Sequence, residues 1–204
     1  MSARPELEAV RIEGMTRSAF ILRGALATGA VYGIGAVAPF VSDALGAGAA
    51  DDQEVLSFAL GLEQLESAFY KAANARAGLG GQAAALAKSF GPHEDEHVKA
   101  ISQLMTQLGG KPGAAAQAKF GLSDQAGFLK LAVTLEDLGV AAYNGAIPLL
   151  KTPDLMSALG AIVNVEARHS AALRSLAGQD PSPQAFDKPK PADQVGVELK
   201  TFVQ

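Results

Sequence analysis

The chain contains an internal repeat of a helical hairpin. Residues 56–70 align without gaps to residues 129–143, and seven of the 15 positions are identical. Residues 94–104 align in the same way to residues 166–176. Chance similarity between two Ala/Leu-rich helices would explain matching leucines and alanines, but not matching glutamates, tyrosines and Glu-x-x-His motifs. The repeat therefore predicts an all-α fold in which a duplicated hairpin forms a four-helix bundle.

Capping and breaking residues indicate where the first two helices begin and end. Asp51 and Asp52 are expected to cap the first helix, and the GLGG stretch at 78–81 to end it. The second helix should run to Gly109-Gly110. It contains Gly91-Pro92, where proline is expected to start or to kink a helix.

The third helix should run from near Ser123 to near Pro148. Thr152-Pro153-Asp154 then predicts the start of the fourth helix, with the threonine hydroxyl as its cap, and Gly178 predicts its end. If a two-fold axis relates the hairpins, the second and third helices run parallel. The 13 residues from 110 to 122 must then span the bundle. Extended, they reach roughly 43–47 Å, against roughly 39 Å for a helix of about 26 residues, so a long crossover connection is feasible.

Three segments are predicted along the chain. Residues 1–50 are an export signal or membrane anchor, residues 51–178 the bundle, and residues 179–204 a Pro-rich tail with a short helix that packs on the bundle.

The N-terminal segment carries the predicted targeting information. Its four arginines precede an uncharged run, residues 24–41. The charged residues that come soon after this run are all acidic. This asymmetry predicts export to the periplasm or cell envelope, through a cleaved signal or an anchor that stays in the membrane. The alternative is a buried helix of the domain.

The repeat also selects polar residues. Glu66 aligns with Gly139, and His93 and Glu96 have no counterparts, so these three are left out of the predicted site. The two copies of the repeat match at one Glu on the first helix of each hairpin and at a Glu-x-x-His motif on the second helix. The Glu and His of that motif are three residues apart and therefore lie on the same face of the helix. The predicted metal ligands are Glu63, Glu94, His97, Glu136, Glu166 and His169.

Four carboxylates and two imidazoles are suited to two metal ions. Four negative charges balance two divalent cations, whereas a metal-free cluster would repel itself and take up protons. Oxygen and nitrogen ligands suit iron, with manganese as the alternative, and leave positions open for oxygen or peroxide. Zinc usually takes fewer carboxylates. An internal polar network without metal is the other interpretation.

The motifs resemble those of a known family. FALGLEQLESAFY, HEDEHVKA, LEDLGVAAYNGAIPLL and VEARHSAALR, with AFDKP in the tail, are similar to exported ferritin-like domain proteins that include desiccation-related proteins. The resemblance implies a ferritin-like four-helix bundle with a di-iron carboxylate centre, and it places the ligands on the same six residues.

Tyr70 and Tyr143 each follow a predicted ligand Glu by seven residues, on the same helix face. They are expected to hydrogen-bond to the ligand carboxylates of the cluster or to supply an electron to it. Ordinary core tyrosines with a paired hydroxyl are the alternative.

Two functions from different classes follow. The first is oxidation of ferrous iron by oxygen or peroxide, with no catalytic residue beyond the metal ligands; manganese-dependent peroxide disproportionation would use the same ligands. The second is a non-catalytic envelope or desiccation-stress protein with a structural metal or none. The absence of cysteine excludes thiolate sites, and the net charge of −4 without a basic run argues against nucleic acid as a partner. The oligomeric state stays open, a homo-oligomer included.

Overall fold

The computed structural model describes residues 51–76 and 78–202. The predicted export signal or anchor therefore lies outside the described residues. The described part contains five α-helices and one short 3-10 helix, Ile147–Leu149. The α-helices are α3 (Asp52–Arg76), α4 (Gly81–Gln107), α5 (Gln125–Ala146), α6 (Pro153–Leu176) and α7 (Ala192–Leu199).

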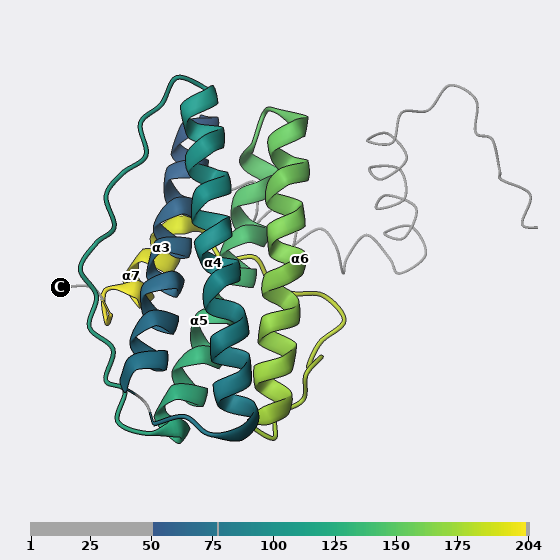
Figure 1. Ribbon diagram of the computed structural model, residues 1–204. Coiled ribbons are helices and arrows are strands. Elements are labelled where there is room, and N and C mark those ends of the chain that lie inside the picture. The colour runs from purple at the N-terminus through teal and green to yellow at the C-terminus, as the bar shows by residue number, and fades with distance from the viewer. Residues whose placement is uncertain (1–50, 77, 203–204) are drawn as a thin grey trace, which may run out of the picture. The chain divides into compact units, whose positions relative to one another are not determined.

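Four of these helices form a bundle of two antiparallel hairpins, α3 with α4 and α5 with α6 (Figure 1). The connection after α4 runs along the side of the bundle back to the end where α5 begins (Figure 1). Helices α4 and α5 are therefore parallel, and the predicted long crossover is observed. The all-helical prediction is confirmed for the described part of the chain.

The ends of the helices are capped only partly as predicted. Asp51 caps α3, because its carboxylate accepts the backbone N–H of Glu54 at 2.9 Å. Asp52 and Thr152 do not cap as predicted: the Thr152 hydroxyl donates to the Asp52 carboxylate at 2.5 Å and makes no cap hydrogen bond. These two residues join the beginnings of α3 and α6 instead. Gly178 follows α6 with a φ of 71°, as expected for a glycine that ends a helix.

Helix α4 continues through Gly91-Pro92. The helix begins at Gly81, so the prediction that Pro92 starts a helix is wrong. Proline removes one backbone hydrogen bond there. Gly91 has a packing role, since a Cβ at this position would lie 3.3 Å from the Cβ of Tyr70. Close contact between α3 and α4 therefore holds this turn in place.

The core has two apolar clusters. One contains Phe69, near the C-terminal end of α3, and Phe128, near the start of α5; the other contains Leu56, near the start of α3, with Ile101 and Leu159. The buried polar residues belong to neither cluster.

The tail packs on the bundle as predicted. Val195 of α7 is fully buried against Leu62 and Leu138, and the Lys190 N–H donates to the Ala141 carbonyl at 2.9 Å. Within residues 51–76 and 78–202, no helix is both long enough and apolar enough to cross a membrane.

Candidate metal centre

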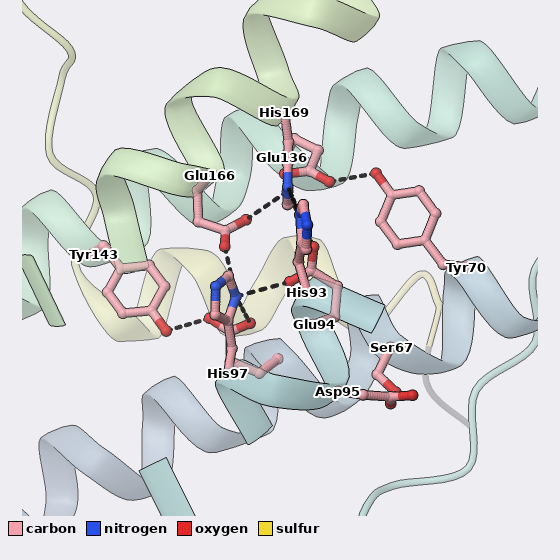
Figure 2. A network of polar contacts seen from close by, with 11 residues as sticks. Ser67, Tyr70, His93, Glu94, Asp95, His97, Glu136, Tyr143, Glu166 and His169 are labelled. Carbon is pink, nitrogen blue, oxygen red and sulfur yellow. Dashed lines mark hydrogen bonds and ion pairs between the residues drawn. The ribbon is translucent and has the colours of Figure 1, made fainter. Parts of the chain in front are cut away.

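The structure brings all six predicted ligand residues into one largely buried cluster, to which each of the four bundle helices contributes; Figure 2 labels all of them except Glu63. The four glutamates are 0% exposed and His169 is 2% exposed. We call these residues the Glu/His cluster: Glu63 of α3, Glu94 and His97 of α4, Glu136 of α5, and Glu166 and His169 of α6.

The Glu/His cluster consists of two overlapping groups of potential ligand atoms. In each group the ligand atoms lie within 4.8 Å of one another. Glu63 and His97 belong only to the first group, the His97 half-site, and Glu136 and His169 only to the second, the His169 half-site. Glu94 and Glu166 belong to both groups. Each group could hold a metal ion, and the two groups have the carboxylates of Glu94 and Glu166 in common.

Several carboxylates surround each histidine nitrogen. Nδ1 of His97 lies 3.1 Å from Glu63, 3.1 Å from Glu94 and 3.0 Å from Glu166. Nδ1 of His169 lies 3.0 Å from Glu94 and 3.4 Å from Glu136. A ring nitrogen carries at most one hydrogen, so these acceptors outnumber the donors.

The surplus acceptors are left without hydrogen-bond partners. Oxygens of Glu94 and Glu136 and both oxygens of Glu166 are buried and accept no hydrogen bond of good geometry. Glu166 is held only at ion-pair distance, 3.0 Å from His97 and 3.8 Å from His169. Buried carboxylates without partners are costly unless they bind a cation. The residues present therefore fit a metal centre in donor type, number and placement.

Without a metal, protons balance the charge of the cluster. Burial raises the pKa of Glu63 to about 8 and that of Glu136 well above its usual value. Burial would lower the pKa of His97, but its close interactions with Glu166, Glu63 and Glu94 outweigh burial and raise this pKa to about 12. In the same way the pKa of His169 rises to about 11. Cation binding at these nitrogens must displace the protons.

Glu166 behaves differently from the other glutamates. Burial would raise the pKa of its carboxyl group, but interactions with His169 and His97 outweigh burial and lower this pKa to about 2. This shared carboxylate is therefore ionised between the two imidazolium groups.

Tyr70 and Tyr143 hydrogen-bond to the cluster across the two hairpins. The Tyr70 hydroxyl donates to Glu136, and the Tyr143 hydroxyl donates to Glu63 (Figure 2). Both tyrosines are 1% exposed. The predicted hydrogen bonds from these two tyrosines to the cluster are therefore present in the structure.

Comparisons with known proteins agree with this architecture. Residues 51–179 match the model of the ferritin-like domain family. The chain belongs to the ferritin-like domain family. It is also similar to the crystal structure of a conserved hypothetical protein, rv2844, from Mycobacterium tuberculosis. That similarity has a TM-score of 0.57 at 19% identity and covers 66% of this chain and 96% of the other, which supports the fold alone. No curated protein matched the sequence.

The ferritin-like domain contains a fifth buried acid that the repeat excluded. Glu66 of α3 is 2% exposed, and its Oε2 atom has no hydrogen-bond partner. Burial, followed by the charges of Glu166 and Glu63, raises the pKa of its carboxyl group well above the usual value. Glu66 belongs to neither group of potential ligand atoms, so its omission from the six predicted ligands is not contradicted, but the repeat gave no indication that it is buried beside them.

His93 is the second residue that the repeat excluded. Its Nδ1 atom lies 2.9 Å from Nε2 of His169, and the two rings stack with centroids 5.2 Å apart. Burial and the charge of His169 lower the pKa of His93, so we assign neutral His93 as the acceptor of the His169 Nε2–H. This hydrogen bond orients His169 with Nδ1 towards the glutamates.

Each hairpin of the ferritin-like domain has a polar link next to the cluster. Asp95, which follows Glu94, accepts a hydrogen bond from Ser67 at 2.7 Å. Asp137, which follows Glu136, accepts one from Ser170 at 2.6 Å and another from Arg174. These links fix the rotation of the paired helices and therefore the direction of the adjacent ligand glutamates.

A groove between α4 and α6 leads to the two histidines of the centre. It has a volume of about 420 Å³, and His97 and His169 are among the residues that line it, together with Phe90 and His93. A separate cavity of about 590 Å³ lies between the tail and helices α5 and α6, and no residue of the Glu/His cluster lines it. The groove is therefore a route by which small molecules could reach the centre.

Proposed function

We propose that this ferritin-like protein binds two iron ions in the Glu/His cluster and oxidises ferrous iron with oxygen or peroxide. The observation that carries the proposal is the pair of overlapping half-sites that share Glu94 and Glu166. Two ions that share carboxylates lie close enough to deliver electrons to one small oxidant, and iron ions would supply those electrons. Manganese is the alternative metal, because the ligand types are the same.

The residues of the chain provide binding, orientation and charge balance. Glu63 with His97, and Glu136 with His169, each offer one carboxylate and one imidazole to a single ion, and the shared glutamates neutralise the remaining charge. Tyr70 and Tyr143 hold Glu136 and Glu63 by hydrogen bonds. The groove at His97 and His169 supports access by a small oxidant from one side.

Elemental analysis and oxygen uptake test this proposal together. Protein loaded with ferrous iron without air should hold two iron ions per chain, consume oxygen on mixing and develop ferric absorbance. The Glu63→Ala/Glu136→Ala double variant should lose both the iron and the oxygen uptake. Wild-type protein that binds two ions without consuming oxygen or peroxide would instead support a non-catalytic stress protein with a structural metal. Peroxide decomposition by manganese-loaded protein alone would support the manganese reaction.

We also propose that the protein is exported and acts in the periplasm or cell envelope. The support is the placement of arginines before the uncharged run of residues 24–41. Fractionation of cells that produce the full chain, with antibody detection, tests this. Recovery in the cytoplasmic fraction alone would contradict it.

A further inference from the structure

Glu66 lies where the two halves of the repeat meet. Glu66 and Gly139 are equivalent positions in the two aligned segments, and they face each other across α3 and α5. A Cβ atom added to Gly139 would come within 2.9 Å of Oε1 of Glu66. Equivalent positions of two copies face each other only at the axis that relates the copies. Glu66 is therefore close to the approximate two-fold axis of the bundle.

This position explains why the repeat has Glu in one copy and Gly in the other. Two side chains placed at the same point of a two-fold axis would overlap, so only one copy can carry a large residue there. Gly139 leaves the room that the Glu66 carboxylate occupies. The difference between Glu66 and Gly139 in the repeat is therefore expected where one carboxylate lies on the axis.

The carboxylate of Glu66 is also without a partner. It is 2% exposed, Oε2 accepts no hydrogen bond, and no ion pair within the described residues includes it. A buried carboxyl group without a partner is costly to the fold. This is an observation independent of the repeat, and it indicates that something else binds Glu66.

The two shared carboxylates occupy corresponding places on the other helices. Glu94 and Glu166 are equivalents in the repeat, and both belong to the two half-sites. The charges of all four cluster glutamates act on Glu66. Glu66 lies on α3, facing α5, whereas the shared pair lies on α4 and α6. Glu66 belongs to neither half-site of the metal-free cluster, so its carboxylate would have to turn towards the ions when they bind.

We propose that Glu66 is a third shared carboxylate, which contacts both metal positions from the α3 and α5 side. The proposal rests on the two-ion centre proposed above. A fifth carboxylate adds negative charge to a centre whose other four already balance two divalent ions. Glu66 therefore favours a higher total positive charge on the two ions and lowers their reduction potential.

Cobalt(II) titration of the full chain tests the role of Glu66, because the visible absorption of cobalt(II) reports its coordination. Wild-type protein should bind two cobalt ions. Glu66→Gln removes the charge while keeping the size of the side chain, and it should weaken binding of both ions by about tenfold or more and change the absorption of both. Glu54→Gln, on the exposed first turn of the same helix, is the matched control and should leave both unchanged.

Gly139→Ala provides a second variant that retains the acid. The added Cβ should displace the Glu66 carboxylate and weaken both cobalt sites in the same way, so the test does not depend on the folding of Glu66→Gln. In iron-loaded protein, redox titration should give a more positive potential for Glu66→Gln than for Glu54→Gln.

Two results would overturn the role of Glu66 while leaving the two-ion centre in place. One is unchanged affinity and absorption in both Glu66→Gln and Gly139→Ala. The other is loss of a single ion with the second unaffected, because a shared ligand must affect both. Wild-type protein that binds fewer than two cobalt ions would reject the centre itself and the role of Glu66 with it.

Discussion

Tyr70 of α3 donates a hydrogen bond to Glu136 of α5, which belongs to the opposite hairpin. Tyr143 of α5 makes the reciprocal contact with Glu63 of α3. Each hairpin therefore orients a carboxylate that the other hairpin supplies. The geometry of the cluster depends on correct docking of the two hairpins, and not on either hairpin alone.

We expect Tyr70→Phe to destabilise the metal-free protein. The change removes the hydrogen bond to a buried oxygen of Glu136, which should lower the free energy of unfolding by about 1–3 kcal/mol. Urea denaturation in the presence of a chelator measures this change in the free energy of unfolding. Tyr143→Phe is the matched variant and should show a loss of similar size, because its contact is equivalent. A change below about 0.5 kcal/mol in both would show that these hydrogen bonds do not support the cluster.

The metal-free protein should lose stability as the pH rises from about 5 to 9. The pKa of Glu63 is raised from 4.5 to about 8, so above pH 4.5 the unfolded chain releases this proton first. The pKa values of His97 and His169 are raised from 6.5 to about 12 and 11, which adds to the loss above pH 6.5. Glu166, with its pKa lowered to about 2, has the opposite effect, but only below pH 4.5.

Thermal unfolding followed by circular dichroism between pH 5 and 9 measures this dependence. Chelated protein should unfold at progressively lower temperature as the pH rises. Metal-saturated protein should not, because bound cations have already displaced the same protons. A midpoint temperature that rises with pH in the chelated sample would contradict the assignment of these protons.

His169 and His93 should differ in their effect on metal binding. His169→Ala removes a ligand and should remove at least one of the two ions. His93→Ala removes only the group that orients His169, so it should keep two ions at saturation but weaken binding of one by about tenfold. Arg168→Ala, an exposed neighbour in the groove, is the control. Titration with manganese(II) distinguishes these outcomes, and unchanged metal content in His169→Ala would count against that ligand.

Gly145 should be necessary for docking of the tail. A Cβ there would come within 2.3 Å of the Lys190 carbonyl oxygen, so Gly145→Ala should separate residues 179–202 from α5. We expect faster proteolysis of the tail and a loss of about 1–3 kcal/mol. Gly160→Ala, in open space on α6, should instead stabilise the helix by about 0.5–1 kcal/mol. Equal effects of the two substitutions on stability and proteolysis would show that the effect of Gly145→Ala does not come from the contact with the tail.

Local residue patterns were enough to predict the helices and the six cluster residues. Glu and His three residues apart must share a helix face, so Glu166 and His169 could be paired without knowledge of the fold. The same reasoning gave no indication that Glu66 and His93 lie beside the cluster, because it considered only positions that match in both copies of the repeat. Glu66 stands opposite Gly139 near the axis, where equal contributions would collide. His93 contacts a residue 76 positions away, and no local spacing indicates that.

The sequence by itself determined the helical fold, the duplication and the identity of the charged groups on the inner faces, because helix periodicity is a property of neighbouring residues. The tertiary structure alone decided that Glu94 and Glu166 are shared, that the tyrosines cross between hairpins, and that Thr152 binds Asp52 rather than capping its own helix. These contacts depend on the separation and rotation of packed helices. Both are set by side-chain packing over the whole bundle, which the spacing of residues within one helix does not specify.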